Sequence, residues 1–559
     1  MKKRTFLAMS MAAALTVGCS SDDITDNGGG VNKDGKAYVG LSITLPTVTD
    51  NGSRAAGDPP QHENGTPEEY KVNTLDIYYY KSESGALTLV NNYHYEGNKL
   101  NWTTPPEGNT VTTKAVLPVE KINHVGALKA LVVVNAPSTD KINNYLDKQA
   151  FELTAADITG VKKNNFLMTN TVYKDGHVLV DVTTSTTEDE ARSKAATHTV
   201  FVERAAAKVG LDVASTGWTD GVYQIAEGKT NAGAKIKIEG WQLDITNKKM
   251  YPVRQFAGTA AGGFSVDDYA RFYHSSHDFR TYWAKDPNYS DYIESDDTKK
   301  ENFNFLVTNS KFSNGLGGVE YCLENTFNVQ HQKQDETTRA LIKATYTPVG
   351  FNTATENEGT VTPAETWYTL GNSSTPLHKK DVEDRIAKAA NFALNITDDS
   401  QKYTAELVEA NILAGKSKII GKMYTIKDAS NNDVTDVTTL QTILKRVQSD
   451  LGELTTYKNG VCFYAVRIRH NNDYDTPWGE NVGNGFENYL SGADGMSKKY
   501  LGRYGVVRNN WYKVTVNNVT QPGDPVVSHT SNQDDEHYNY IQTTINILDW
   551  AVRDQGVDL

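Results

Sequence analysis

The residues best suited to metal chemistry are two histidines and an aspartate in the stretch HSSHD. His274, His277 and Asp278 lie within five residues, so two imidazoles and a carboxylate could reach one ion. A complete site needs a fourth ligand or a helical i, i+4 pair, and this stretch offers neither. We interpret it as a solvated loop and predict no bound metal.

Two glycine-containing stretches partly match nucleotide-binding motifs. AGKSK, at 414–418, has the lysine and serine of a phosphate loop, but Ala410 stands where the motif needs glycine. GNGFEN, at 483–488, lacks the third glycine of a dinucleotide fingerprint. No local stretch supplies a catalytic triad or a carboxylate pair. The sequence therefore predicts neither an enzyme nor a cofactor.

The first residues have the pattern of an export signal. Lys2 to Arg4 are basic, and an apolar run follows from Phe6 to Val17. This run is too short to span a bilayer, which takes roughly 17 to 25 residues. Small residues lead into Cys19, as in a lipoprotein signal peptide, whose cysteine is acylated and becomes the new N-terminus. Acyl chains would hold the protein on a membrane surface; the alternative is a secretory signal with an incidental cysteine.

Composition limits the class of protein further. A chain of 559 residues predicts two or more domains, and a net charge of -13 is unsuited to nucleic acid. Thirty tyrosines and 43 glycines favour β structure with many turns. Besides Cys19 the chain has only Cys322 and Cys462, so it is no disulfide scaffold. Those two could pair in an oxidising compartment, and the sequence leaves this open.

Alternating apolar and polar residues predict strands along most of the chain. In AYVGLSITLP, one face holds Val39, Leu41, Ile43 and Leu45, and the other holds Gly40, Ser42 and Thr44. This pattern predicts a half-buried strand. Residues 72–81 predict a strand that turns at 82–85, residues 127–137 a central strand, and residues 201–213 the strand that closes the first unit. A second β series begins at 234–253.

Two helical stretches interrupt the second series. Apolar side chains share one face in residues 379–394 and again in residues 438–451, and we interpret both stripes as core. We therefore predict a mainly β fold with two tandem antiparallel β-sandwich-like (transthyretin-like) domains and short helical insertions.

The two ends of the body carry matching strands. YIQTTINILDW places Ile541, Thr543, Ile545 and Ile547 on one face, as many residues and nearly the same bulk as the inward face of the first strand. A polar linker with two prolines, residues 520–539, precedes it. Between the first strand and the body lies SRAAGD, a loop of small residues around Arg54.

An ordered set of segments resembles one known family over nearly the whole chain. YVGLSITLP, SRAAGD, LVVVNAP, ERAAAKVGLDV, WQLDITNKKMYPV, YCLENTF, VVRNNWYKVTVNNV and INILDWAVRDQGVDL follow in that order. Together with the lipoprotein start, they resemble the fimbrillins of Bacteroidales-type (type V) pili, most closely the major subunit of the short, or minor, fimbriae.

The resemblance implies a maturation route. Such precursors reach the outer membrane as lipoproteins, and an arginine-specific protease cuts them in the loop after the first strand. The matching position here is Arg54, with Ala55 as the new N-terminus. Cutting frees the first strand, and the vacated groove then accepts the C-terminal strand of another copy. The expected product is a cell-surface fimbrium that supports adhesion and biofilm formation. Its expected partners are other copies, accessory and anchor pilins, the protease and host or bacterial surface receptors, with a membrane contact only through the precursor's lipid.

These interpretations divide the chain into five parts. They are a signal peptide (1–18), a propeptide with the first strand (19–54), an N-terminal β-sandwich (55–215), a C-terminal β-sandwich with helical insertions (216–519), and a linker with the donor strand (520–559). The alternative function is an accessory or tip adhesin, or a glycan-binding surface lipoprotein that uses exposed Trp218, Trp283 and Trp478. Copy number along isolated fibres separates a stalk subunit from a tip subunit.

Overall fold

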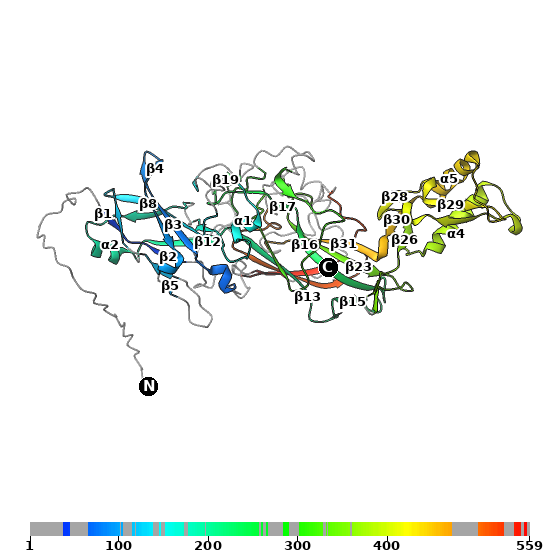
Figure 1. The fold of residues 1–559 in the computed structure, drawn as a ribbon, viewed down its shortest axis with the longest axis horizontal. Helices are drawn as coiled ribbons and strands as arrows, with labels where there is room; N and C mark the ends of the chain where they lie inside the picture. The colour runs from blue at the N-terminus through cyan, green and yellow to red at the C-terminus, as the bar shows by residue number, and fades with distance from the viewer. Residues whose placement is uncertain are drawn as a thin grey trace, which may run out of the picture.

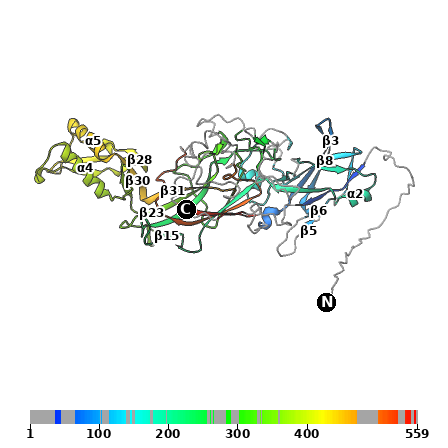
Figure 2. The same ribbon diagram turned by 180° about the vertical axis from the view of Figure 1, so that it is seen from behind.

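The fold is an elongated row of three regions, seen in a computed structural model of the chain (Figure 1). The N-terminal sheet lies at one end, the sheets that hold the C-terminal strands lie in the middle, and helices α4 and α5 lie at the opposite end (Figures 1 and 2). The structure describes residues 37–44, 65–100, 102–103, 114–117, 119–137, 145–146, 151–172, 177–195, 197–255, 259–260, 264–265, 283–289, 301–327, 331–332, 334–357, 360–471, 501–529, 541–548 and 553–555.

The first region is built on a nine-stranded sheet. Its strands follow the spatial order β4-β3-β8-β10-β12-β2-β6-β5, and β11 also pairs with β8. The bounds are β2 (Ser42–Thr44), β3 (Thr74–Glu83), β4 (Ala86–Glu96), β5 (Trp102–Thr103), β6 (Lys114–Val116), β8 (Ala127–Val134), β10 (Met168–Asn170), β11 (Val180–Thr183) and β12 (Thr199–Arg204). Strand β1 (Ala37–Val39) pairs separately with β7 (Glu120–Ile122). One apolar core packs against these strands.

The second region has two five-stranded sheets around another core. The first sheet has the order β22-β13-β32-β33-β34, with bounds β13 (Ala207–Val213), β22 (Val319–Cys322), β32 (Trp511–Val519), β33 (Ile541–Leu548) and β34 (Arg553–Gln555). The second has the order β14-β15-β16-β23-β31, with bounds β14 (Trp218–Thr219), β15 (Val222–Gln224), β16 (Lys235–Asp244), β23 (Arg339–Thr347) and β31 (Val461–Arg467).

The third region gathers both predicted helices around a core of its own. The helices are α4 (Lys379–Ala393) and α5 (Val437–Leu451), and the strands are β26 (Trp367–Leu370), β27 (Thr404–Leu407), β28 (Gly415–Lys418), β29 (Tyr424–Lys427) and β30 (Glu453–Tyr457). Val382, Ile386 and Val447 are fully buried in this core, because apolar side chains recur on one face of each helix.

Short elements complete the described part. The two-stranded ladders pair β18 (Lys249–Met250) with β9 (Phe151–Glu152), β17 (Thr246–Asn247) with β21 (Phe303–Asn304), β19 (Thr259–Ala260) with β20 (Phe264–Ser265), and β24 (Thr355–Asn357) with β25 (Thr360–Thr362). The short helices are α1 (Ala155–Thr159), α2 (Glu188–Lys194), η1 (Pro67–Tyr70), η2 (Gly97–Lys99), η6 (Asp399–Gln401), η7 (Glu409–Asn411), η8 (Gly421–Met423) and η9 (Lys458–Gly460). Within the described residues, no helix is long and apolar enough to cross a membrane.

The structure confirms a mainly β fold and corrects several details. Residues 201–213 do not form one closing strand, because the chain passes from β12 to the second region at Ala205 and Ala206, and β13 pairs with β22 and β32. Not all pairing is antiparallel: β2 runs parallel to β12, and β13 runs parallel to β32. AGKSK lies on β28, which pairs antiparallel with β30 and so lacks the strand-loop-helix setting of a phosphate loop.

Candidate functional site

The predicted first strand consists of β1 and β2, and β2 lies in the interior of its sheet. Strand β2 is paired on one side with β12, parallel, and on the other side with β6, antiparallel. Its neighbour β1 pairs with β7, and Tyr38 forms a bridge with Ser185. Without this segment, β12 and β6 would each present unpaired backbone groups toward the same gap.

Backbone hydrogen bonds hold the segment on both sides. Tyr38 and Ser185 exchange two of them, with N···O distances of 2.8 and 2.7 Å. The Ser42 amide donates to the carbonyl of His198 at 3.1 Å, and the Leu117 amide donates to the carbonyl of Leu41 at 3.0 Å. A strand that replaced this segment would have to satisfy the same flanking groups.

The inward face is as the sequence predicts over the described residues. Val39, Leu41 and Ile43 are fully buried in the core of the first region, while Leu45 lies outside the described residues. Burying three such side chains stabilises the folded state by roughly 5 to 9 kcal/mol. The first strand is therefore a structural part of the N-terminal core.

The opposite face is also covered, which corrects the prediction of a half-buried strand. Ser42 is fully buried, and helix α2 packs on Gly40 so closely that a Cβ there would lie 2.2 Å from the carbonyl oxygen of Ala191. Backbone atoms of a helix cannot move aside cheaply, so only glycine fits this position in the present arrangement. The first strand is enclosed on both faces.

Four buried polar atoms around this strand have no hydrogen-bond partner. They are Ser42 Oγ, Tyr79 OH, Glu120 Oε1 and Ser185 Oγ. Burial raises the pKa of Glu120 to about 7, and burial together with the nearby Glu120 raises the pKa of Tyr79. Unpaired buried polar groups are costly, so the first strand leaves hydrogen-bonding groups of its site unsatisfied.

The chain just beyond the predicted cleavage loop is anchored firmly. Glu69, on η1, is buried, and its carboxylate lies 2.7 Å from Lys208 Nζ and accepts a hydrogen bond from the Tyr321 hydroxyl. Burial raises the pKa of Glu69, but the charge of Lys208 and the hydrogen bonds from Lys208, Tyr321 and the Thr66 amide together hold the pKa below its usual value. Arg204 Nε donates to the Glu69 carbonyl at 2.8 Å. These contacts join the start of the body to the second region.

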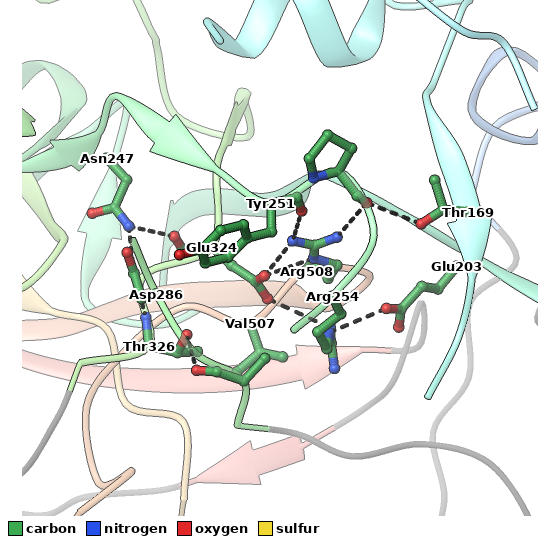
Figure 3. A network of polar contacts seen from close by, with 12 residues as sticks. Thr169, Glu203, Asn247, Tyr251, Arg254, Asp286, Glu324, Thr326, Val507 and Arg508 are labelled. Carbon is green, nitrogen blue, oxygen red and sulfur yellow. Dashed lines mark hydrogen bonds and ion pairs between the residues drawn. The ribbon is translucent and has the colours of Figure 1, made fainter. Parts of the chain in front are cut away.

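A chain of buried charges fixes strand β12 to the second region (Figure 3). Arg254 lies between two carboxylates, 3.2 Å from Glu203 and 3.5 Å from Glu324. Glu324 also accepts from Arg508 Nε at 2.8 Å. Although burial raises the pKa of Glu324, Arg508 and Arg254 hold it below its usual value. The first residues of β12 thus pair with β2, and Glu203 near its end belongs to this network of charges.

The C-terminal strand is folded back on its own body. Strand β33 pairs antiparallel with β32, and β34 pairs with β33 on the other side. The predicted inward residues stand opposite buried residues of β32 in the pairs Ile541–Val519, Thr543–Val516, Ile545–Val514 and Ile547–Tyr512. Within the part of the chain that the structure describes, the last strand is thus next to the sheet edge, which the three residues of β34 form.

The described part of the predicted linker is bound to the body. Asp524 and Phe463 exchange two backbone hydrogen bonds of 2.9 and 2.7 Å. Arg339 Nη2 donates to the Ser528 carbonyl at 2.9 Å, and His529 lies 2.9 Å from the Asp244 carboxylate. The first part of the predicted linker, up to His529, is therefore held on the body. Residues 530–540, between this anchor and β33, lie outside the described residues.

Other predicted residues are placed as follows. Cys19, Arg54, Ala55, HSSHD and Trp478 lie outside the described residues. Cys322 and Cys462 are buried and free, so this structure does not contain the possible disulfide, and burial raises the pKa of Cys462 to about 12. Trp283 is buried and therefore is not an exposed sugar-stacking residue, whereas Trp218 is half-buried.

Sequence reasoning missed Glu69, Glu120 and Arg508. A charged residue in a single sequence is by default assigned to the surface. A weak signal existed for Glu69, because TPEE has a proline at the start of a helical turn and an acidic residue three positions after threonine, as in a capping box.

Comparison with known families identifies the C-terminal region. Residues 455–556 match the family described as major fimbrial subunit protein type IV, fimbrillin, C-terminal. In its C-terminal region the chain belongs to the fimbrillin family. This family is structural and non-enzymatic, and its members are fimbrial cell-surface proteins. The matched region of this fimbrillin holds β31, β32, β33 and β34.

Solved structures are similar to this fimbrillin only at low identity. A candidate cell adhesion protein from Parabacteroides distasonis is 10% identical, with coverage of 94% of this chain and 98% of that one and a TM-score of 0.37. The fimbrilin FimA from Porphyromonas gingivalis is 12% identical, with 93% and 99% coverage and a TM-score of 0.31. The tip fimbrial protein Mfa3 from the same species is 9% identical, with 91% and 99% coverage and a TM-score of 0.29. Values this low carry no argument of their own, and no curated protein sequence matches the chain.

Proposed function

We propose that this fimbrillin is a stalk subunit, exported as a lipoprotein through Cys19, cut after Arg54 and polymerised head to tail by strand exchange. The observation that carries the proposal is the position of the first strand, which is central in its sheet and yet belongs to the part of the chain that the cut removes. Loss of a central strand leaves two facing edges, β12 and β6, which are a template for another strand.

The anchoring of Glu69 supports cleavage without unfolding. The predicted cut falls between Thr44 and Gly65, the two described residues that flank the loop. From η1 onward the body is held through Glu69 to Lys208 and Tyr321 in the second region. The propeptide can therefore leave while the mature chain keeps its fold.

The C-terminal strand supports the other half of the exchange. It lies near a sheet edge, follows an anchored segment that ends at His529, and repeats the inward pattern of the first strand. Its own site and the N-terminal groove are different surfaces, so the contact between copies is heterologous and need not close into a ring. A filament is the expected product.

Replacement of the arginine tests the proposal. Arg54→Ala is expected to keep the first strand in place and leave the surface protein monomeric, whereas wild-type material should begin at Ala55 and form a ladder that collapses only on strong heating in detergent. Arg385→Ala, on an exposed position of α4, is the matched control and should leave maturation unchanged. Normal fibres from Arg54→Ala would contradict strand exchange, and a single copy at the fibre end would contradict a stalk role.

A further inference from the structure

Four buried polar atoms without a hydrogen-bond partner lie at the first-strand site. Glu120 is 8% exposed and Tyr79 is fully buried, and neither Glu120 Oε1 nor Tyr79 OH has a hydrogen-bond partner. Ser42 and Ser185 add two unpaired hydroxyls on the other face of the strand. Apolar side chains of the first strand offer no hydrogen bond to a carboxyl group that is buried beside them.

Glu120 faces the core side of the groove. It stands directly opposite Val39 in the antiparallel pair of β1 and β7, and opposite residues point to the same face. Leu41 is two positions further along that face, at the diagonal distance of roughly 7 to 8 Å that a long side chain can reach. The tyrosines Tyr79 and Tyr93 lie close enough for the charge of Glu120 to raise their pKa values, in addition to the effect of burial.

The proposed donor strand has one polar residue on its inward face. Aligned as Ile541, Thr543, Ile545 and Ile547 on Val39, Leu41, Ile43 and Leu45, it replaces Leu41 with Thr543. A threonine hydroxyl can donate one hydrogen bond and accept others, whereas leucine offers none. The single mismatch in the donor pattern thus falls where the groove holds its unpaired carboxyl group.

We propose that Glu120, with Tyr79 beside it, is the selecting contact of the groove, and that it binds the hydroxyl of Thr543 from a second copy. This inference rests on the proposed strand exchange. It assigns a chemical preference to the groove: an extended strand with a hydrogen-bonding side chain at the position of Leu41. The chain's own first strand holds the site without this contact, and the incoming strand supplies it.

A double-mutant cycle on full-length chains cut after Arg54 tests this assignment. Fibres of Thr543→Val are expected to dissociate about tenfold faster in heated detergent than wild-type fibres, because the buried carboxyl group again lacks a partner. Glu120→Leu should also speed dissociation, and the double variant should recover most of the loss. Thr544→Val is the matched control, because adjacent strand residues point to opposite faces.

Uncut chains provide the second readout. In the uncut protein, Glu120→Leu is expected to raise Tm. The effect of Thr543→Val on Tm should be the same with and without Glu120→Leu. The coupling between the two substitutions should therefore appear only in fibres. Glu120→Gln, which keeps the size and a hydrogen-bonding group, should retain part of the fibre stability. Equal dissociation of wild-type and Thr543→Val fibres, or additive effects in the double variant, would overturn the inference and leave strand exchange standing. Failure of the cut wild-type chain to form fibres would overturn both.

Discussion

The first and last strands of this fimbrillin have similar alternation of apolar and polar residues but different positions in their sheets. The first strand is held between β12 and β6 and covered by α2, whereas the last strand is held by β32 on one side and only by short β34 on the other. One strand is enclosed and the other is near an edge. Alternation of apolar residues specifies a strand, but its place in the sheet decides how easily it leaves.

The largest expected effect comes from removing the last strand. Deletion of residues 541–559 should abolish fibres completely, because no segment remains to fill the N-terminal groove. The body should stay folded, since β32 keeps its long parallel pairing with β13. Electron microscopy and thermal unfolding of the same sample measure both results. Fibres from the truncated chain would show that another segment is the donor.

The next effect concerns the buried ion pair that joins the start of the body to the second region. Lys208→Met leaves the buried carboxylate of Glu69 without its cation, and the free energy of unfolding should fall by about 3 to 5 kcal/mol before and after cleavage. Denaturant unfolding measures it. Lys380→Met breaks a pair of equal length on the exposed face of α4 and should cost at most about 0.5 kcal/mol. Equal losses in the two variants would mean that the buried pair is no anchor.

A smaller effect distinguishes the uncut protein, which holds the first strand, from the cut protein, which has lost it. Gly40→Val forces a side chain against α2 and should lower the stability of the uncut protein by about 1 to 3 kcal/mol. The cut protein has lost residue 40 and should be unchanged. Gly421→Val is the control, because a Cβ at Gly421 meets no atom within 4 Å. A loss of Tm that persists after cleavage would place the defect elsewhere.

The smallest effect is a dependence on pH. The pKa of Glu120 is raised from 4.5 to about 7, so the folded state binds this proton more tightly than the unfolded state. Its contribution to stability is complete below about pH 4.5 and is lost as the pH rises toward 7. Asp286, with a pKa of about 7, changes with the same sign, so the difference in Tm between wild type and Glu120→Gln isolates Glu120. A difference that does not change over pH 4.5 to 7 would exclude Glu120 as its source.

Sequence patterns were sufficient for local structure. The period of two in Val39, Leu41 and Ile43 and the helical spacing of Val382 and Ile386 reflect side-chain geometry that every strand and helix shares. These patterns therefore predicted the strand, the helix and the mainly β class.

The parts that were not predictable depend on contacts between distant residues. Gly40 is enclosed by Ala191, and Glu120 stands opposite Val39, yet nothing near these residues in the sequence marks the contact. The parallel pairing of β2 with β12 and the anchoring of Asp524 on Phe463 are of the same kind. A single sequence shows which face of a strand is apolar, but it does not show what covers the other face.

Helix α2 gives the two states of the groove different outer surfaces. If the last strand enters in the register proposed above, Gln542 takes the place of Gly40, and its Cβ cannot coexist with the Ala191 carbonyl where it now stands. The helix must then move outward, and its acidic first turn, Glu188 to Glu190, moves with it. The position of α2 on the outside of each subunit would then differ between subunits that hold the first strand and subunits that hold the last strand of another copy. An antibody against this helix could then count unexchanged subunits in an intact fibre.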